Sequence, residues 1–232
     1  MILVAIDTAT PATVAGVLLD DGRVVEARED PPVGSRGEHA ALVLALLERA
    51  LEESGVAWAD VERIAVGVGP GGFTGLRIGI ATARALAQGH GLPLVGVGSL
   101  AALAAGANAT MPGGDAGEGD LVAAVLDARR GEVFAGAWAA GRELMAPAAL
   151  APGALAERLS GLESPVQAVG DGAIRFRPEL EGAGAVIPAD GSPVHRIAAA
   201  PLCRLGAVGE PTERDQLLPD YRREPDAKPP QR

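Results

Sequence analysis

The stretch that decides the fold of this chain is "VAIDT" at residues 4–8, together with its partial repeat "AVLDA" at residues 124–128. Each is a short apolar run of strand-forming residues that ends near an aspartate, Asp7 in the first and Asp127 in the second. Around both runs the patterns predict the same order of elements: three strands, a helix, a strand and a further helix. The chain is therefore predicted to contain two copies of one α/β unit, the second less complete.

Local signals place the elements of the first copy. An Asp-Gly pair at residues 21–22 separates two apolar runs, which is a strong hairpin signal. Ser35 and Glu38 form the S-x-x-E capping pattern and Gly55 can end the same helix. Strands separated by helices pair in parallel, so the sheet is predicted to be mixed. The predicted strands are 2–7, 13–19, 22–28, 63–69 and 93–98, and the predicted helices are 35–54, 75–88 and 99–105.

The second copy is predicted to follow a linker over residues 106–120, which has no apolar periodicity. This divides the chain into lobes over 1–105 and 121–220, followed by a polar, proline-rich and partly disordered tail over 221–232. Two βββαβα lobes with mixed sheets resemble the actin-like (ASKHA, ribonuclease H-like) superfamily. In the second lobe the predicted strands are 121–129, 132–139, 142–147 and 166–170, and the predicted helices lie near 152–160 and 194–208.

Composition limits the classes of partner and the compartment. The chain has 232 residues and a formal net charge of −10, and an acidic protein repels a phosphate backbone. The alternative is that the acidity serves solubility alone. If the protein acts on RNA, a partner is expected to hold it. The single cysteine, Cys203, excludes an internal disulfide and indicates a reducing compartment. Asp7 interrupts the first apolar run, which predicts neither a signal peptide nor a membrane span, and a cytoplasmic location is expected.

The glycine-rich stretch "GPGGFTGLRIG" at residues 69–79 raises the question of a nucleotide site. A phosphate-binding P-loop needs a lysine, and the only lysine in the chain is Lys228. Gly67, Gly69 and Gly72 match G-x-G-x-x-G, but no acidic residue follows about 20 positions on. Thr74 is the predicted N-cap of the next helix. On these residues alone a tight strand-to-helix turn is favoured over an anion site.

Two predicted helices carry unusual surfaces. Gly75, Gly79, Ala83 and Ala87 recur every four residues and form one small-residue stripe, which would let another helix approach. Residues 40–47, "AALVLALL", are apolar at every position. If Ala40, Leu44, Leu47 and Leu51 pack on the sheet, then Leu42, Val43 and Leu46 remain on other faces. This surplus favours a protein–protein interface over cover by a further helix of the same layer.

Chemistry by this chain alone is not expected. His39, His90 and His195 lack metal-ligand spacing, no G-x-S-x-G nucleophile is present, and Cys203 lies in an apolar run. ATP-using actin-like proteins carry D-x-G-[TS] at the first strand end, whereas this chain has alanine at the glycine position after Asp7. Asp7, Thr8 and Asp127 are therefore interpreted as vestigial phosphate-loop positions.

Several stretches together resemble the TsaB (YeaZ) family over nearly the whole chain: "ILVAIDTAT", "EHAALVLALL", "GVGPGGFTGLRIGIATARALA", "LDARRGEVF" and "LPDYRRE". The resemblance implies a non-catalytic bacterial protein that binds and supports the TsaD transferase. TsaD makes N6-threonylcarbamoyladenosine beside the anticodon of tRNAs reading codons that start with A, and the ATPase TsaE completes the assembly. It further implies contact with tRNA only through the complex and no contact with a membrane.

The resemblance also implies a partner interface on the first two long helices, through which a homodimer can form when TsaD is absent. Carried over to this chain, it comprises His39, Leu42, Val43, Leu46, Gly71, Phe73, Thr74, Gly75, Arg77, Ile78 and Ala81, and the small-residue stripe adds Gly79 and Ala83. Gly72 stands where the family commonly has serine. No cofactor, metal or catalytic residue is expected, and a nucleotide at the partner interface is left open. The alternatives are an actin-like small-molecule kinase or ATPase and, more remotely, a metallopeptidase homologue.

Overall fold

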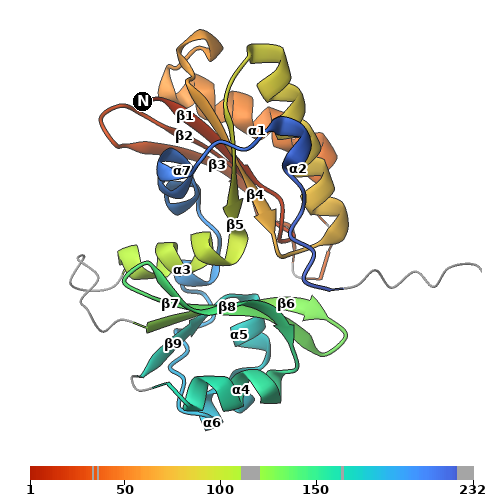
Figure 1. The fold of residues 1–232 in the computed structure, drawn as a ribbon, viewed down its shortest axis with the longest axis vertical. Coiled ribbons are helices and arrows are strands. Elements are labelled where there is room, and N and C mark those ends of the chain that lie inside the picture. The colour runs from red at the N-terminus through yellow and green to blue at the C-terminus, as the bar shows by residue number, and fades with distance from the viewer. Residues whose placement is uncertain (33, 36, 111–120, 163–164, 224–232) are drawn as a thin grey trace, which may run out of the picture.

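The computed structural model describes residues 1–32, 34–35, 37–110, 121–162 and 165–223. The chain forms two lobes, each built on one mixed sheet, and the lobes are stacked along the long axis of the molecule (Figure 1). The predicted plan of two α/β units with mixed sheets is thus confirmed.

The first sheet has the strand order β3-β2-β1-β4-β5. The Asp-Gly hairpin joins two antiparallel strands as predicted, and the strands that follow helices pair in parallel. Its strands are β1 (Leu3–Asp7), β2 (Thr13–Leu18), β3 (Val24–Glu29), β4 (Arg63–Gly69) and β5 (Leu94–Gly98).

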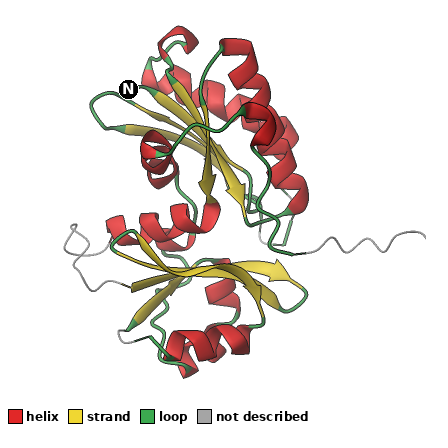
Figure 2. Cartoon of the chain, in the orientation of Figure 1, coloured by secondary structure: helices red, strands yellow, loops and turns green. Residues whose placement is uncertain are grey.

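Helices cover both faces of the first sheet (Figure 2). Helices α1 (His39–Ser54) and α2 (Phe73–His90) lie on one face, where Val43, Leu47 and Ile80 pack against the β1 residues Val4 and Ile6. On the other face lie α3 (Ser99–Thr110) and α7 (Ala199–Val208), in the core that contains Leu3, Ala5 and Leu202.

The second sheet has the strand order β8-β7-β6-β9. Its strands are β6 (Leu121–Arg129), β7 (Glu132–Ala139), β8 (Arg142–Leu150) and β9 (Val166–Val169). One face packs against α3, and the other is covered by α4 (Pro152–Ser160), α5 (Asp171–Arg175) and α6 (Arg177–Gly182). Because one apolar cluster contains Leu103 of α3, Leu3 of β1 and Val122 of β6, the lobes share a core around α3.

The strand pairing of Asp7 in the first sheet matches that of Asp127 in the second, as the similar sequences around them predict. Asp7 lies opposite Val14 of β2, and Asp127 lies opposite Val133 of β7. Each aspartate therefore has the same pairing position, but Ile6 packs beneath α1 and α2 whereas Leu126 packs against α3, so the two carboxylates face different layers of the molecule.

The starts of α1 and α2 differ from prediction. Helix α1 begins at His39, and the Ser35 hydroxyl donates to the Pro32 carbonyl at 2.7 Å instead of capping the helix. Gly55 ends α1 in the left-handed region, with φ 71°, as predicted. Helix α2 has Gly72 as N-cap, so the assignment of Thr74 was wrong, and it continues past the predicted end at Gly89.

The lobe boundaries were also placed wrongly. Residues 106–110 continue α3, so the predicted linker starts too early, and its remainder at 111–120 lies outside the described residues. The predicted second lobe includes α7, which packs on the first sheet. Two glycines permit this close contact: a Cβ at Gly16 would lie 2.4 Å from Ala199 Cβ, and one at Gly206 would lie 2.4 Å from Ala65 Cβ.

The C-terminal residues are described as far as Arg223, and residues 224–232 of the predicted tail lie outside the described part. Within the described ranges, no helix is both long and apolar enough to cross a membrane.

Candidate functional site

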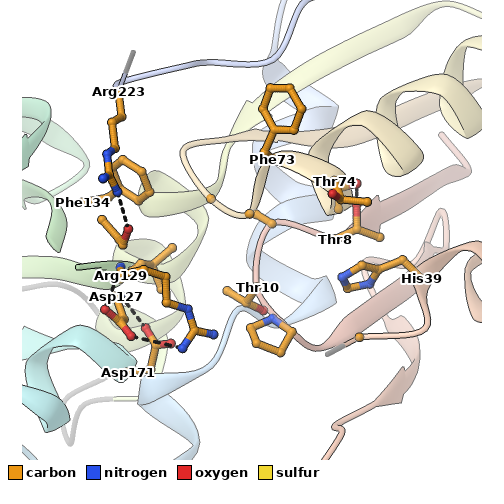
Figure 3. A pocket seen from close by; sticks show the side chains of 18 of the residues that line it. Thr8, Thr10, His39, Phe73, Thr74, Asp127, Arg129, Phe134, Asp171 and Arg223 are labelled. Atoms are coloured by element: carbon orange, nitrogen blue, oxygen red, sulfur yellow. Dashed lines mark hydrogen bonds and ion pairs between the residues drawn. The ribbon is translucent and has the colours of Figure 1, made fainter. Parts of the chain in front are cut away.

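A cleft of about 800 Å³ lies between the lobes, at the ends of β1 and β6 (Figure 3). The first lobe contributes the turn after β1, His39 and the start of α2. The second lobe contributes the β6–β7 hairpin and Asp171. Both vestigial phosphate-loop regions that the sequence indicated therefore meet at one cleft.

Asp7 lies beneath this cleft, outside the residues that line it. Its side chain is 1% exposed, and its carboxylate accepts hydrogen bonds from the Ala9 N–H and the Ser99 hydroxyl, both at 2.8 Å. A Cβ at Gly67 would lie 1.8 Å from the carboxylate, so glycine is required above it. Burial raises the pKa of Asp7, while the two hydrogen bonds oppose that rise. The carboxylate thus joins the end of β1 to the turn that follows it and to the start of α3.

The small-residue stripe of α2 faces inward, onto the turn after β1. A Cβ at Gly75 would lie 2.1 Å from the Thr8 carbonyl oxygen, and one at Gly79 would lie 2.3 Å from Thr8 Oγ1. The Thr8 hydroxyl donates to the Gly75 carbonyl at 2.7 Å. The close approach that these glycines allow is therefore with the chain's own first strand, which corrects their assignment to a partner interface.

The same correction applies to the other assigned interface residues that are buried within the lobe, namely His39, Val43, Leu46 and Ala83. They position α1 and α2 on the sheet, and none of them lies on the outer surface of these helices. The remaining assigned residues are exposed or partly exposed: Leu42, Gly71, Phe73, Thr74, Arg77, Ile78 and Ala81.

His39 forms part of the cleft wall (Figure 3). Its Nδ1 lies 2.8 Å from the Thr13 hydroxyl, and burial lowers its pKa. Gly37 and Gly75 leave room for the ring, because a Cβ at Gly37 would lie 2.5 Å from its Cε1. A neutral imidazole held in this way serves packing between α1, β2 and α2.

Asp127, on the opposite wall, is paired with arginines. Its carboxylate contacts Arg175 at 2.8 Å and Arg129 at 3.5 Å, and its N–H donates to the Asp171 carboxylate at 3.0 Å. Arg129 and Arg130 have φ values of 65° and 54°, in the region that favours glycine. Arg175 and Arg129 therefore occupy the carboxylate that would have to hold a magnesium–phosphate group.

A second feature lies outside the cleft, on the solvent side of α1 and α2. A groove of about 480 Å³ is lined by Leu44, Ala81, Thr82, Ala85, Leu86, Gly89 and His90. Leu44 is 48% exposed, which is unusual for a leucine in the middle of a helix. Of the assigned interface residues, Ala81 lies in this groove.

The sequence interpretation missed Leu44 because it placed α1 in the wrong rotation. It assigned Leu44 to the face that packs on the sheet, whereas that face carries Val43, Leu46, Leu47, Ala50 and Leu51. The i, i+3, i+4, i+7, i+8 spacing of these five residues is the signal that would have found it.

The remaining candidates for chemistry are used by the fold. His90 stacks on Trp58 with ring centroids 4.3 Å apart, and His195 Nδ1 accepts the Gly170 N–H. Burial raises the pKa of the Cys203 thiol to about 12. Across the described residues, no three His, Cys, Asp or Glu side chains gather as a metal-binding group.

Comparison with known proteins gives consistent matches. The family model "TsaD: tRNA N6-adenosine threonylcarbamoyltransferase" matches residues 31–177. The "tRNA threonylcarbamoyladenosine biosynthesis protein TsaB" of Escherichia coli is 40% identical over 138 residues, which are 58% of this chain and 53% of that protein. The chain thus aligns with about half the length of that relative.

Solved structures agree with the sequence matches. YeaZ from Pseudomonas aeruginosa superposes with a TM-score of 0.77 at 30% identity, covering 95% of this chain and 99% of that one. A ROK hexokinase from Thermus thermophilus shares the two-lobed actin-like fold alone, with a TM-score of 0.54 at 16% identity over 89% of this chain and 99% of that one.

Proposed function

The chain belongs to the TsaB (YeaZ) family, and from that premise we propose that it takes part in making N6-threonylcarbamoyladenosine in tRNA. Its role in this proposal is that of a non-catalytic subunit in the cytoplasm, which binds and supports a TsaD-like transferase. A TsaE-like ATPase and the tRNA would join through the complex, and a nucleotide, if one takes part, would lie at the partner boundary.

The observation that carries the partner role is the apolar groove between α1 and α2. Leu44 and Leu86 form its walls, and Ala81 and Ala85 are small enough to let the backbone of a partner helix come close. An exposed apolar surface between two long helices is typical of a helix-packing interface. The same groove would join two copies of this chain when the transferase is absent.

The cleft supports the non-catalytic part of the proposal. A kinase or ATPase of this fold needs a carboxylate available to a metal–phosphate group. Here the Asp7 carboxylate is buried on Ala9 and Ser99, and that of Asp127 is paired with Arg175. A metallopeptidase needs clustered ligands, whereas the ring of His39 is held by Thr13.

The test places a charge in the groove by Leu44→Glu. A buried, unpaired carboxylate at an interface is expected to weaken binding to the TsaD-like partner by about 100-fold or more. Binding is measured by co-purification and by titration calorimetry of the purified proteins. The matched control is Leu144→Glu, which changes a leucine that is 40% exposed on β8 of the other lobe and should leave affinity unchanged.

Circular dichroism and thermal melting must show that both variants are folded. The proposal fails if the folded Leu44→Glu protein binds the transferase as tightly as the Leu144→Glu control does. Analytical ultracentrifugation of the same variants, without the partner, tests whether the groove also supports a homodimer.

A further inference from the structure

The chain crosses between the lobes a third time at its C-terminal end, after α3 leads into β6 and after the return to α7. Residues 217–223, which we call the C-terminal strap, run from the first sheet past the start of α2 to the β6–β7 hairpin (Figure 1). Asp220, Tyr221, Arg222 and Arg223 of this strap line the cleft. We propose that the strap is a latch, which holds the two lobes at a fixed separation across the cleft.

The strap is anchored to the first lobe by both backbone and side chain. Leu217 is 5% exposed and packs over Gly96, where a Cβ would lie 2.7 Å from its Cδ1. The Asp220 N–H donates to the Val68 carbonyl of β4 at 2.8 Å. This part of the strap therefore moves with the first sheet.

An aromatic contact extends that anchor to α2. The rings of Tyr221 and Phe73 stack with centroids 5.3 Å apart. The Arg77 guanidinium lies 3.8 Å from the centre of the Phe73 ring, and its Nε donates to the Tyr221 hydroxyl at 2.8 Å. Cation–π and stacking contacts hold a planar side chain in one orientation. With Tyr221 held on α2, the following residues of the strap extend toward the second lobe.

Arg223 makes the connection to the second lobe (Figure 3). Its guanidinium donates to the Ala128 carbonyl of β6 at 3.1 Å and pairs with Glu132 of β7 at 3.5 Å. These two residues stand on opposite sides of the β6–β7 hairpin. One side chain therefore holds the hairpin that forms the far wall of the cleft.

The contacts around α3 and those of the strap join the lobes in different ways. Around α3 they share a buried apolar core, which includes Leu100, Leu103 and Phe134. The strap makes polar and aromatic contacts at the surface, with Tyr221 43% exposed. In Figure 1, α3 and the strap lie on opposite sides of the molecule. A buried apolar contact on one side and a few surface contacts on the other make a hinge and a latch.

The distance between the lobes can be measured directly in the full chain. Glu48 on α1 and Glu157 on α4 are exposed and belong to different lobes, so each is replaced by cysteine for spin labelling. Cys203 is buried with a raised thiol pKa, so it should not take up the label. Pulsed electron paramagnetic resonance then gives the distribution of distances between the labels.

Four substitutions in the labelled protein separate the contribution of the latch from that of its surroundings. Tyr221→Ala removes the anchor on α2, and Arg223→Ala removes the contact with the hairpin. Arg222→Ala is the matched control, because the Arg222 Nε contact is with Asp220 of the same strap. Tyr221→Phe keeps the stacked ring and removes only the hydrogen bond from Arg77.

We expect Tyr221→Ala and Arg223→Ala to raise the population at longer distances about fivefold, as the loss of one net hydrogen bond would do. Tyr221→Phe should do so to a smaller extent, and the control should match the parent protein. Melting temperatures must show that each variant is folded. Unchanged distributions in the first two variants, or equal broadening in the control, would overturn the latch.

Discussion

The strand ends at Asp7 and Asp127 occupy equivalent places in the two lobes, yet their surroundings are opposite. Asp7 is buried, and its carboxylate accepts hydrogen bonds from the Ala9 N–H and the Ser99 hydroxyl. Asp127 lines an open cleft and is held by Arg175 and Arg129. The same sequence pattern therefore leads to a carboxylate bonded to neutral groups in one lobe and, in the other, to a carboxylate with a 7% exposed side chain that pairs with exposed arginines.

The face of the sheet to which each carboxylate points causes this difference. In both lobes glycines let a helix start lie directly on the strand: Gly75 contacts Thr8, and Gly172 contacts Leu126 and Asp127. The Asp7 carboxylate points to the other face, toward Gly67 and Ser99 at the start of α3, whereas Asp127 contacts Asp171 and Arg175 of α5. The surroundings of each carboxylate are thus decided by the layer of the molecule that it faces.

The largest expected effect tests the close contact in the first lobe. Gly75→Ala would place a methyl group 2.1 Å from the Thr8 carbonyl oxygen, and the required shift should cost about 3 kcal/mol of folding stability. Gly89→Ala, in the same helix, has nothing within 4 Å and should be neutral or slightly stabilising. Urea unfolding of both variants measures the difference, and equal stabilities would contradict the inward orientation of the stripe.

A smaller effect concerns the sealed carboxylate. Because burial raises the folded-state pKa of Asp7 above its unfolded value, the wild-type protein loses stability as the pH rises through these two values. Asparagine does not titrate, so Asp7→Asn should gain stability relative to wild type between pH 4 and pH 7. At pH 4 the two proteins should differ by no more than about 1 kcal/mol.

Urea unfolding at both pH values checks this sign. His39 is present in both proteins, so its own titration cancels in the difference. A stability difference that does not change with pH, or that changes in the opposite direction, would show that the Asp7 carboxylate is not sealed as described.

The smallest effect is expected at the second strand end. Asp127→Asn removes the ion pairs with Arg175 and Arg129, whose side chains are 50% and 65% exposed. The Asp127 side chain is 7% exposed, but the Arg129 N–H can still donate to an asparagine oxygen, so the loss of the pairs with exposed arginines should cost about 1 kcal/mol, and salt screens these pairs. The cost in urea unfolding should shrink when salt is added. A cost as large as that of Gly75→Ala would remove the contrast between the two ends.

Much of the fold follows from local residue patterns. The Asp21-Gly22 turn, the apolar runs and the alternation of strands with helices were sufficient to predict two mixed sheets, because turn chemistry and periodicity act over a few residues. The position of α7 could not be predicted in this way. The apolar face of α7 indicates that the helix is buried, but not on which of the two sheets it packs. That depends on its close contacts with Gly16 and Ala65, which are far away in the chain.

The site was predicted less well than the fold, for two physical reasons. Small residues such as Gly79 permit close approach by any neighbour, so the pattern cannot distinguish the chain's own strand from a partner helix. Residues 40–47 of the first helix are apolar at every position, so the direction of its buried face is poorly defined. That ambiguity placed Leu44 on the sheet, whereas it lies in the exposed groove.

The return of α7 to the first sheet also sets an order on folding during synthesis. The ribosome makes β1 first, but the cluster that buries Leu3 and Ala5 includes Leu202 and Cys203 near the other end of the chain. Until those residues emerge, one face of the first sheet lacks part of its cover and exposes apolar surface. A polypeptide stopped at residue 120 would therefore be an unfinished lobe rather than a free-standing half, and the nascent chain gains its completed core only when translation is nearly over.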